Sequence, residues 1–243
     1  MRMSMPLLAA ALLAAPAAGT VLAQDPAPAT TPPLPEGYVL VQEDVLAAFV
    51  TAPGEYLHKA RDEYIVTDLK GSADNIRRCA WFLKLIAGAS TRQGKKALMA
   101  SAENLEKLAA NVEDNRVKTL QELDDSFAAA EYALARHHYL KAEESAGKLT
   151  ARLGREIKAA AVHFEEALSW SGRKLETVPK SLVEDAKTLA ERLIRGTAGA
   201  GEKISDKVSS LGREIERLGS DLLPGKKEAP LPLKTPASEE AVR

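Results

Sequence analysis

The residues whose types could support chemistry in this sequence are four histidines and the carboxylates near them. Glu55 and His58 form an E-x-x-H on an expected helix, a spacing found in carboxylate-bridged metal bundles. Those bundles use two such pairs and two further glutamates, and this sequence has no second E-x-x-H. The spacing therefore fits a histidine with a local carboxylate neighbour better than a metal centre, so we predict no cofactor and no bound metal.

His137 and His138 are the only adjacent histidines. Neighbouring residues on a helix point about 100° apart, so these two rings cannot enter one site without a partner from another helix. His163 is the candidate partner, because it lies on the next expected helix. This leaves an alternative function, a bundle that binds a metal or small ligand through histidines and carboxylates.

Nucleophilic chemistry finds little support. Cys79 stands beside Trp81 and Phe82 on an apolar stripe, where a thiol is typically a small core residue. No serine occupies a nucleophile elbow, and the glycines form no phosphate-binding loop. We predict no catalytic residue and no enzymatic activity. As the only cysteine, Cys79 also excludes a disulfide within the chain.

Two expected helices within residues 126–172 position the histidines. In the first, small and aromatic residues recur at steps of four and three, which places them on one helical stripe. The stripe comprises Ala128, Tyr132, Ala135, Tyr139, Ala142 and Ala146. The second arm repeats the spacing from Ile157 to Leu168, with the bend expected at residues 147–154. Alanine-rich stripes let helices approach closely, whereas Arg136 is expected on a solvated face.

The rest of residues 38–178 shows the same helical periodicity, so we predict an all-α, antiparallel helical bundle. A short helix is expected to end at Pro53-Gly54, and Ser72 is expected to cap a later one. Residues 82–84 align with residues 139–141 at an offset of 57. The bundle is therefore either a duplicated helical hairpin or two helix pairs that share only a common pattern.

Residues 179–223 are expected to form a long C-terminal amphipathic helical segment that bends or separates at three glycines between 196 and 201. Its distal part has a narrow apolar seam at four-three spacing. The seam comprises Ile204, Val208, Leu211, Ile215, Leu218 and Leu222. It predicts either a surface for a protein partner or a second copy of the chain, or a helix that folds back over the bundle.

The two ends of the chain have different compositions. Residues 1–23 combine Arg2, a short apolar run and small residues before Ala23, which predicts a signal peptide cleaved after Ala23 and a periplasmic or secreted protein. Residues 24–37 contain five prolines and are expected to form a disordered tether, and residues 224–243 a disordered tail.

Charge excludes one class of partner. Removal of Arg2 lowers the number of Lys and Arg from 33 to 32 against 34 acidic residues, so no electrostatic attraction to nucleic acid is expected. Membrane-surface contact is not favoured either, because the distal seam lacks bulky aromatics and a positive excess. The sequence therefore predicts an exported, non-catalytic structural, adaptor or chaperone-like protein that acts through helical surfaces.

Overall fold

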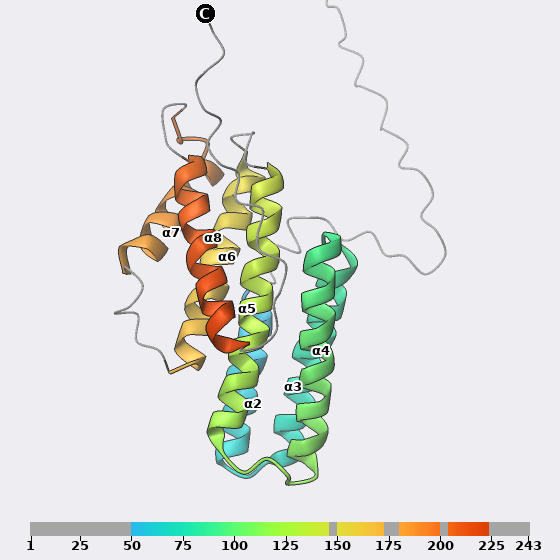
Figure 1. Ribbon diagram of the computed structural model, residues 1–243. Coiled ribbons are helices and arrows are strands. Elements are labelled where there is room, and N and C mark those ends of the chain that lie inside the picture. The colour runs from blue at the N-terminus through green and yellow to red at the C-terminus, as the bar shows by residue number, and fades with distance from the viewer. Residues whose placement is uncertain (1–49, 146–149, 173–179, 200–203, 224–243) are drawn as a thin grey trace, which may run out of the picture. The chain divides into compact units, whose positions relative to one another are not determined.

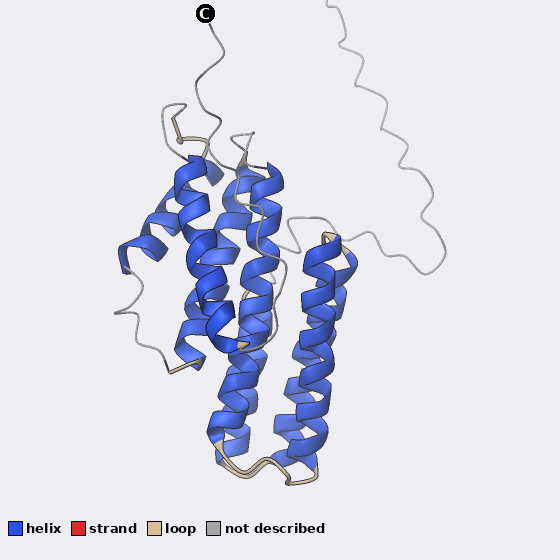
Figure 2. Ribbon diagram, viewed as in Figure 1, coloured by secondary structure: helices blue, strands red, loops and turns tan. Residues whose placement is uncertain are grey.

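The computed structural model describes residues 50–145, 150–172, 180–199 and 204–223, all within the unit Val41–Arg243. The described residues form seven helices and no strand (Figures 1 and 2). These are α2 (Ala52–Ile65), α3 (Leu69–Gly88), α4 (Arg92–Glu113), α5 (Leu120–Ser145), α6 (Ala151–Trp170), α7 (Lys180–Ile194) and α8 (Ile204–Leu222). Successive helices pack antiparallel in pairs, which confirms the predicted all-α antiparallel architecture. The expected signal peptide, tether and tail lie outside the described residues, as does the expected short helix before Pro53 up to residue 49.

Helix α5 is the central element. It packs against α2, α4, α6 and α8, and between Phe127 and Ala142 almost every residue is buried. Its alanines allow this, because small side chains let neighbouring helix backbones approach on several sides. The expectation of a solvated face at Arg136 is wrong: this side chain is only 1% exposed, and its Nε lies 3.1 Å from Glu216 Oε1 of α8.

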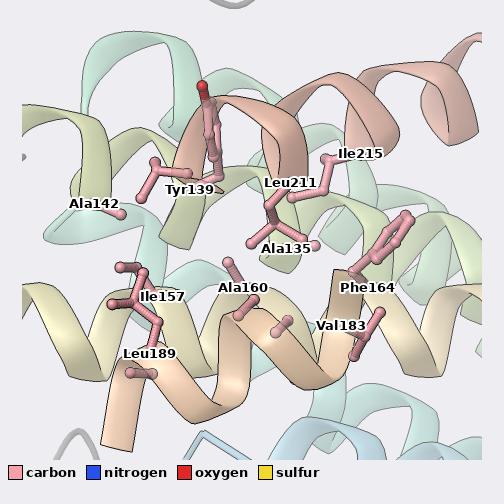
Figure 3. Packing of buried hydrophobic residues seen from close by; sticks show 14 of the residues in the cluster. Ala135, Tyr139, Ala142, Ile157, Ala160, Phe164, Val183, Leu189, Leu211 and Ile215 are labelled. Atoms are coloured by element: carbon pink, nitrogen blue, oxygen red, sulfur yellow. The ribbon is translucent and has the colours of Figure 1, made fainter. Parts of the chain in front are cut away.

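The described helices share two hydrophobic clusters, and α5 belongs to both. Its first part, which includes Leu123 and Phe127, packs with α2, α3 and α4. Its second part, which includes Ala135 and Tyr139, packs with α6, α7 and α8, as Figure 3 shows. The predicted stripe is buried from Ala128 to Ala142. Three polar residues of α5, namely Glu131, Arg136 and His137, are buried together with these apolar side chains.

Glycines set the closeness of α8 to α5. A Cβ built on Gly212 would overlap the ring of Tyr139, and one built on Gly219 would overlap the ring of Tyr132. The two glycines are seven residues apart in α8, and the two tyrosines are seven residues apart in α5. Each tyrosine ring therefore fills the place that a side chain of α8 would occupy. Gly154 has a similar role in α6 and not the predicted place in a bend, because its Cβ would lie 2.6 Å from the Ala190 carbonyl oxygen of α7.

The distal seam packs against other helices of the same chain. Ile204, Val208, Leu211, Ile215 and Leu218 are at most 5% exposed, and they belong to the cluster with α5, α6 and α7. Leu222 is half-buried against both clusters. Of the two arrangements that the sequence leaves open, the described residues adopt the one in which the segment folds back, with α7 and α8 as separate helices.

Two expected helix boundaries are wrong. Pro53 and Gly54 lie in the first turn of α2 and do not end a helix; proline suits this place because its missing N–H has no partner there anyway. Helix α3 begins at Leu69, where the side chain of Asp68 accepts a hydrogen bond of 3.0 Å from Gly71 N. Asp68 is therefore the N-cap, and Ser72 is buried inside the helix.

Candidate functional site

A buried histidine–glutamate pair joins α5 to α6. His163 Nδ1 lies 2.6 Å from Glu131 Oε2, and the two residues are 1% and 0% exposed. An ionised carboxylate only accepts hydrogen bonds, so Nδ1 carries the proton and donates it. The second atom of each group, Glu131 Oε1 and His163 Nε2, is buried without a hydrogen-bond partner in the described part of the chain. Two polar atoms are thus removed from water at a cost that a ligand or water molecule would offset.

The pair lines a small pocket of about 100 Å³ between α2, α5 and α6. The lining residues are Thr51, Gly54, Glu55, His58, Glu131, Val162, His163 and Glu166. Gly54 keeps space open beside the buried carboxylate, because a Cβ at that position would lie 3.3 Å from Glu131 Oε1. Thr51, Glu55 and His58 are exposed, so the pocket reaches solvent on the side of α2.

His58 forms the outer wall together with Glu166. Its Nε2 lies 3.0 Å from Glu166 Oε2, and its ring centroid lies 4.5 Å from that of Trp170. The side chains of His58 and Glu166 are 54% and 35% exposed, so water screens this pair far more than the buried one. The outer pair closes the pocket loosely, whereas the inner pair is fixed by packing.

His138 and His137 extend the cluster along α5. The ring of His138 stacks on that of His163, with centroids 5.5 Å apart and planes 8° apart, and the ring of His137 lies 4.8 Å from that of His138. His138 Nδ1 is 2.7 Å from Glu156 Oε2, and His137 Nδ1 is 3.0 Å from Ser90 Oγ. Residues from the loop between α3 and α4, from α5 and from α6 therefore form one continuous polar path.

Burial sets the charge state of this path. It lowers the pKa of His137 to about 2, with smaller contributions from electrostatic interaction with His138, Lys141 and His163. Burial also lowers the pKa of His138, although its hydrogen bond to Glu156 opposes the change. Burial would raise the pKa of Glu156, but His138 and Lys141 outweigh it and the net change is downward. His137 is accordingly a neutral ring at physiological pH.

The histidines that the sequence singles out come together in the structure. Glu55, His58 and His163 line one pocket, and His138 and His137 continue from His163. His163 is the partner from another helix that the two adjacent histidines require. No group of three or more His, Cys, Asp or Glu in the described ranges is arranged to hold a metal ion.

Two glutamates of the site, Glu131 and Glu156, were missed by the sequence analysis. A glutamate in a helix normally indicates a solvated face, yet Glu131 is followed and preceded by alanines and aromatic residues within residues 127–135. These apolar neighbours on both sides were the feature of the sequence that could have indicated burial of Glu131. Cys79 is buried, as predicted for a core residue; burial, and then the charge of Glu131, raise the pKa of its thiol well above the ordinary value.

An exposed apolar surface forms a second feature. Trp81 and Leu85 lie one turn apart on α3 and are 59% and 42% exposed. Phe82 contacts Trp81 edge-on at 5.2 Å and Tyr56 of α2 at 5.7 Å. Arg78 lies over the Tyr56 ring at 5.9 Å. We call Tyr56, Arg78, Trp81, Phe82 and Leu85 the α3 patch.

No known family model, curated protein or solved structure matches this chain. Within the described ranges, no helix has both the length and the apolar character needed to cross a bilayer.

Proposed function

We propose that the protein is an exported, non-catalytic helical interaction protein and that it binds a protein partner through the α3 patch. The observation that carries the proposal is the exposure of Trp81 and Leu85 on a helix whose other face is fully buried. A bundle of this kind gains no stability from large apolar side chains left in water, whereas tryptophan is enriched at the centre of protein interfaces.

The chemistry of the α3 patch favours a partner helix with an apolar stripe. Trp81 and Leu85 have the four-residue spacing that fits a helix laid across them. Arg78 stands one turn before Trp81 and places positive charge at one end of the patch. We therefore expect an acidic residue next to the apolar stripe of the partner, where it would pair with the guanidinium.

Cross-linking in the native cell envelope, followed by quantitative mass spectrometry, tests this function. Trp81→Ser combined with Leu85→Ser should remove the partner that the unchanged protein captures. Ile65→Ser combined with Val66→Ser is the matched control, because these residues are 51% and 70% exposed at the end of α2. Equal capture by both double variants would overturn the assignment of the surface.

Export rests on residues 1–23, which lie outside the described residues. We propose cleavage after Ala23, so the mature protein would begin at Gln24. The intact mass of protein recovered from the periplasm or medium checks this. A protein that retains Met1 and stays in the cytoplasm would contradict it.

The second candidate function is binding of a metal or small ligand by the histidine and carboxylate cluster. Its supporting observation is the pair of buried atoms without partners, Glu131 Oε1 and His163 Nε2, beside the pocket. Metal analysis of protein purified without an affinity tag tests the metal form. A metal content below about one tenth of an equivalent would remove that form and leave a non-metal ligand.

We also propose that α3–α4 and α5–α6 descend from one duplicated hairpin. Leu83 and Leu140, which align at the offset of 57, are both buried, and each hairpin packs extensively within itself. Each hairpin also has an ion pair within itself, Lys84 with Glu106 and Lys141 with Glu156, although these two glutamates do not align at the offset of 57. An alignment of homologous chains should show the offset again at core positions, and its absence would leave only a common helical pattern.

A further inference from the structure

The chemistry of the pocket defines what it can bind. When His163 donates through Nδ1 to Glu131 as a singly protonated ring, its Nε2 carries a lone pair and accepts a hydrogen bond. Glu131 Oε1 is likewise an acceptor, and neither atom has a partner within the described residues. Two buried acceptors that share a pocket call for a ligand with at least two hydrogen-bond donors.

The charges at the pocket indicate that this ligand is a cation. Three glutamates line it, at positions 55, 131 and 166, and its lining includes neither lysine nor arginine. Histidines 58 and 163 lie beside two of these carboxylates and offset part of the charge only when protonated. The pocket therefore attracts small cations. A bare metal ion is disfavoured, because the described residues offer no group of three ligands that could hold one.

Size restricts the cation further. A volume of about 100 Å³ is smaller than typical drug-sized sites and holds only a few heavy atoms. The inner end is closed by the buried pair, and the outer end is bordered by exposed residues of α2. A group that fits these limits has its charge and donors at one end and a short alkyl part at the other, for which Val162 supplies an apolar lining side chain.

We propose that the pocket between α2, α5 and α6 binds a primary alkylammonium group, which donates hydrogen bonds to Glu131 Oε1 and His163 Nε2. This proposal rests on the second candidate function and gives its ligand class. The ammonium group belongs either to a free small amine or to a lysine side chain of a partner protein, since both present the same –CH₂–NH₃⁺ end.

Titration of the full-length mature protein with defined amines tests the proposal. The probes are methylammonium, n-butylammonium and Nα-acetyl-lysine amide, with tetramethylammonium as a control that has the charge but no N–H donor. Long-range ¹H–¹⁵N spectra of the imidazoles report binding, because the Nε2 signal of His163 should shift with the three primary amines and not with the control. Tighter binding of the lysine amide than of n-butylammonium would identify a lysine side chain as the source; the reverse order would identify a free amine.

Two variants separate pocket binding from unspecific charge effects. Gly54→Ala leaves both acceptors in place but puts a methyl group 3.3 Å from Glu131 Oε1, and alanine suits the helical backbone there. It should weaken amine binding by at least about tenfold without lowering the melting temperature. Glu131→Gln keeps the shape and removes the charge, and it should weaken binding to a similar extent.

The results that would overturn the alkylammonium proposal differ from those that would overturn the second candidate function. No shift of His163 with any primary amine, or equal shifts with tetramethylammonium, would overturn the proposal and indicate that water occupies the pocket. Unchanged binding in the Gly54→Ala variant would place the amine elsewhere and overturn it as well. A metal bound in the analysis described above would preserve the second candidate function while excluding its alkylammonium form.

Discussion

Substitution of Gly219 by alanine tests whether α8 covers α5. The glycine lies directly over the aromatic ring of Tyr132, and an added Cβ would overlap the Cζ and hydroxyl of that ring. Tyr132 is 2% exposed and packs inside the same cluster as Leu218. Because the ring is enclosed in this cluster, the helices must separate or the ring must leave its rotamer.

The expected magnitude follows from two opposing effects. Insertion of extra atoms into a packed interior costs about 1–3 kcal/mol. Replacement of glycine by alanine within a helix contributes up to about 1 kcal/mol in the other direction. The overlap is too severe for a small adjustment, so we expect a net loss of about 1–2 kcal/mol in the free energy of unfolding. Gly88→Ala is the matched control: nothing lies within 4 Å of its added Cβ in α3.

Urea unfolding followed by circular dichroism measures both variants against the unchanged protein. Gly219→Ala should lower the unfolding midpoint, whereas Gly88→Ala should leave it unchanged or raise it slightly. If Gly219→Ala were as stable as the control, α8 would not lie against Tyr132 in solution. Its seam from Ile204 to Leu222 would then be available to a partner, and our account of the fold would be refuted.

Three further predictions concern buried and exposed side chains. Because the pKa of His137 is lowered to about 2, the unfolded chain takes up a proton below pH 6.5 that the folded chain does not. As the pH decreases from 6.5 toward 2, His137 should therefore lower the free energy of unfolding by up to about 1.4 kcal/mol per pH unit. Urea unfolding at a series of pH values should show a smaller dependence on pH for the His137→Gln variant. Cys79 should react with iodoacetamide only on unfolding, since burial raises its thiol pKa; rapid labelling of the native protein would contradict its burial. In single-tryptophan variants, Trp81 should be quenched readily by acrylamide and Trp170, at 7% exposure, should be protected; similar quenching of both would argue against the α3 patch.

The helical pattern carried most of the information about the fold. Ala128, Tyr132, Ala135 and Tyr139 were predicted to be buried because they share a stripe, and they are. The pattern could not show that the opposite side of α5 is covered as well. A stripe reports where one neighbour packs, whereas the number of neighbours depends on contacts between residues far apart in the chain. For this reason Arg136 was expected in solvent although Glu216 of α8 pairs with it.

The candidate site was predictable only in part. The histidines were recognised by their type, but their assembly depends on how α2, α5 and α6 meet, which local spacing does not encode. Glu131 was missed because a helical glutamate usually faces water. Gly154 was assigned to a bend because glycine often ends helices, although here it allows close contact with α7. In each case a residue with a common local role has a different role set by a distant helix.

The protonation state of the His163 ring tests the central claim about the site most directly. A long-range ¹H–¹⁵N spectrum of the folded protein at neutral pH, without added amine, distinguishes the two imidazole tautomers. Our account predicts a proton on Nδ1, donated to Glu131, and an unprotonated Nε2 directed at the pocket. A proton on Nε2 with a bare Nδ1 would contradict the His163–Glu131 hydrogen bond and the ligand site built on it.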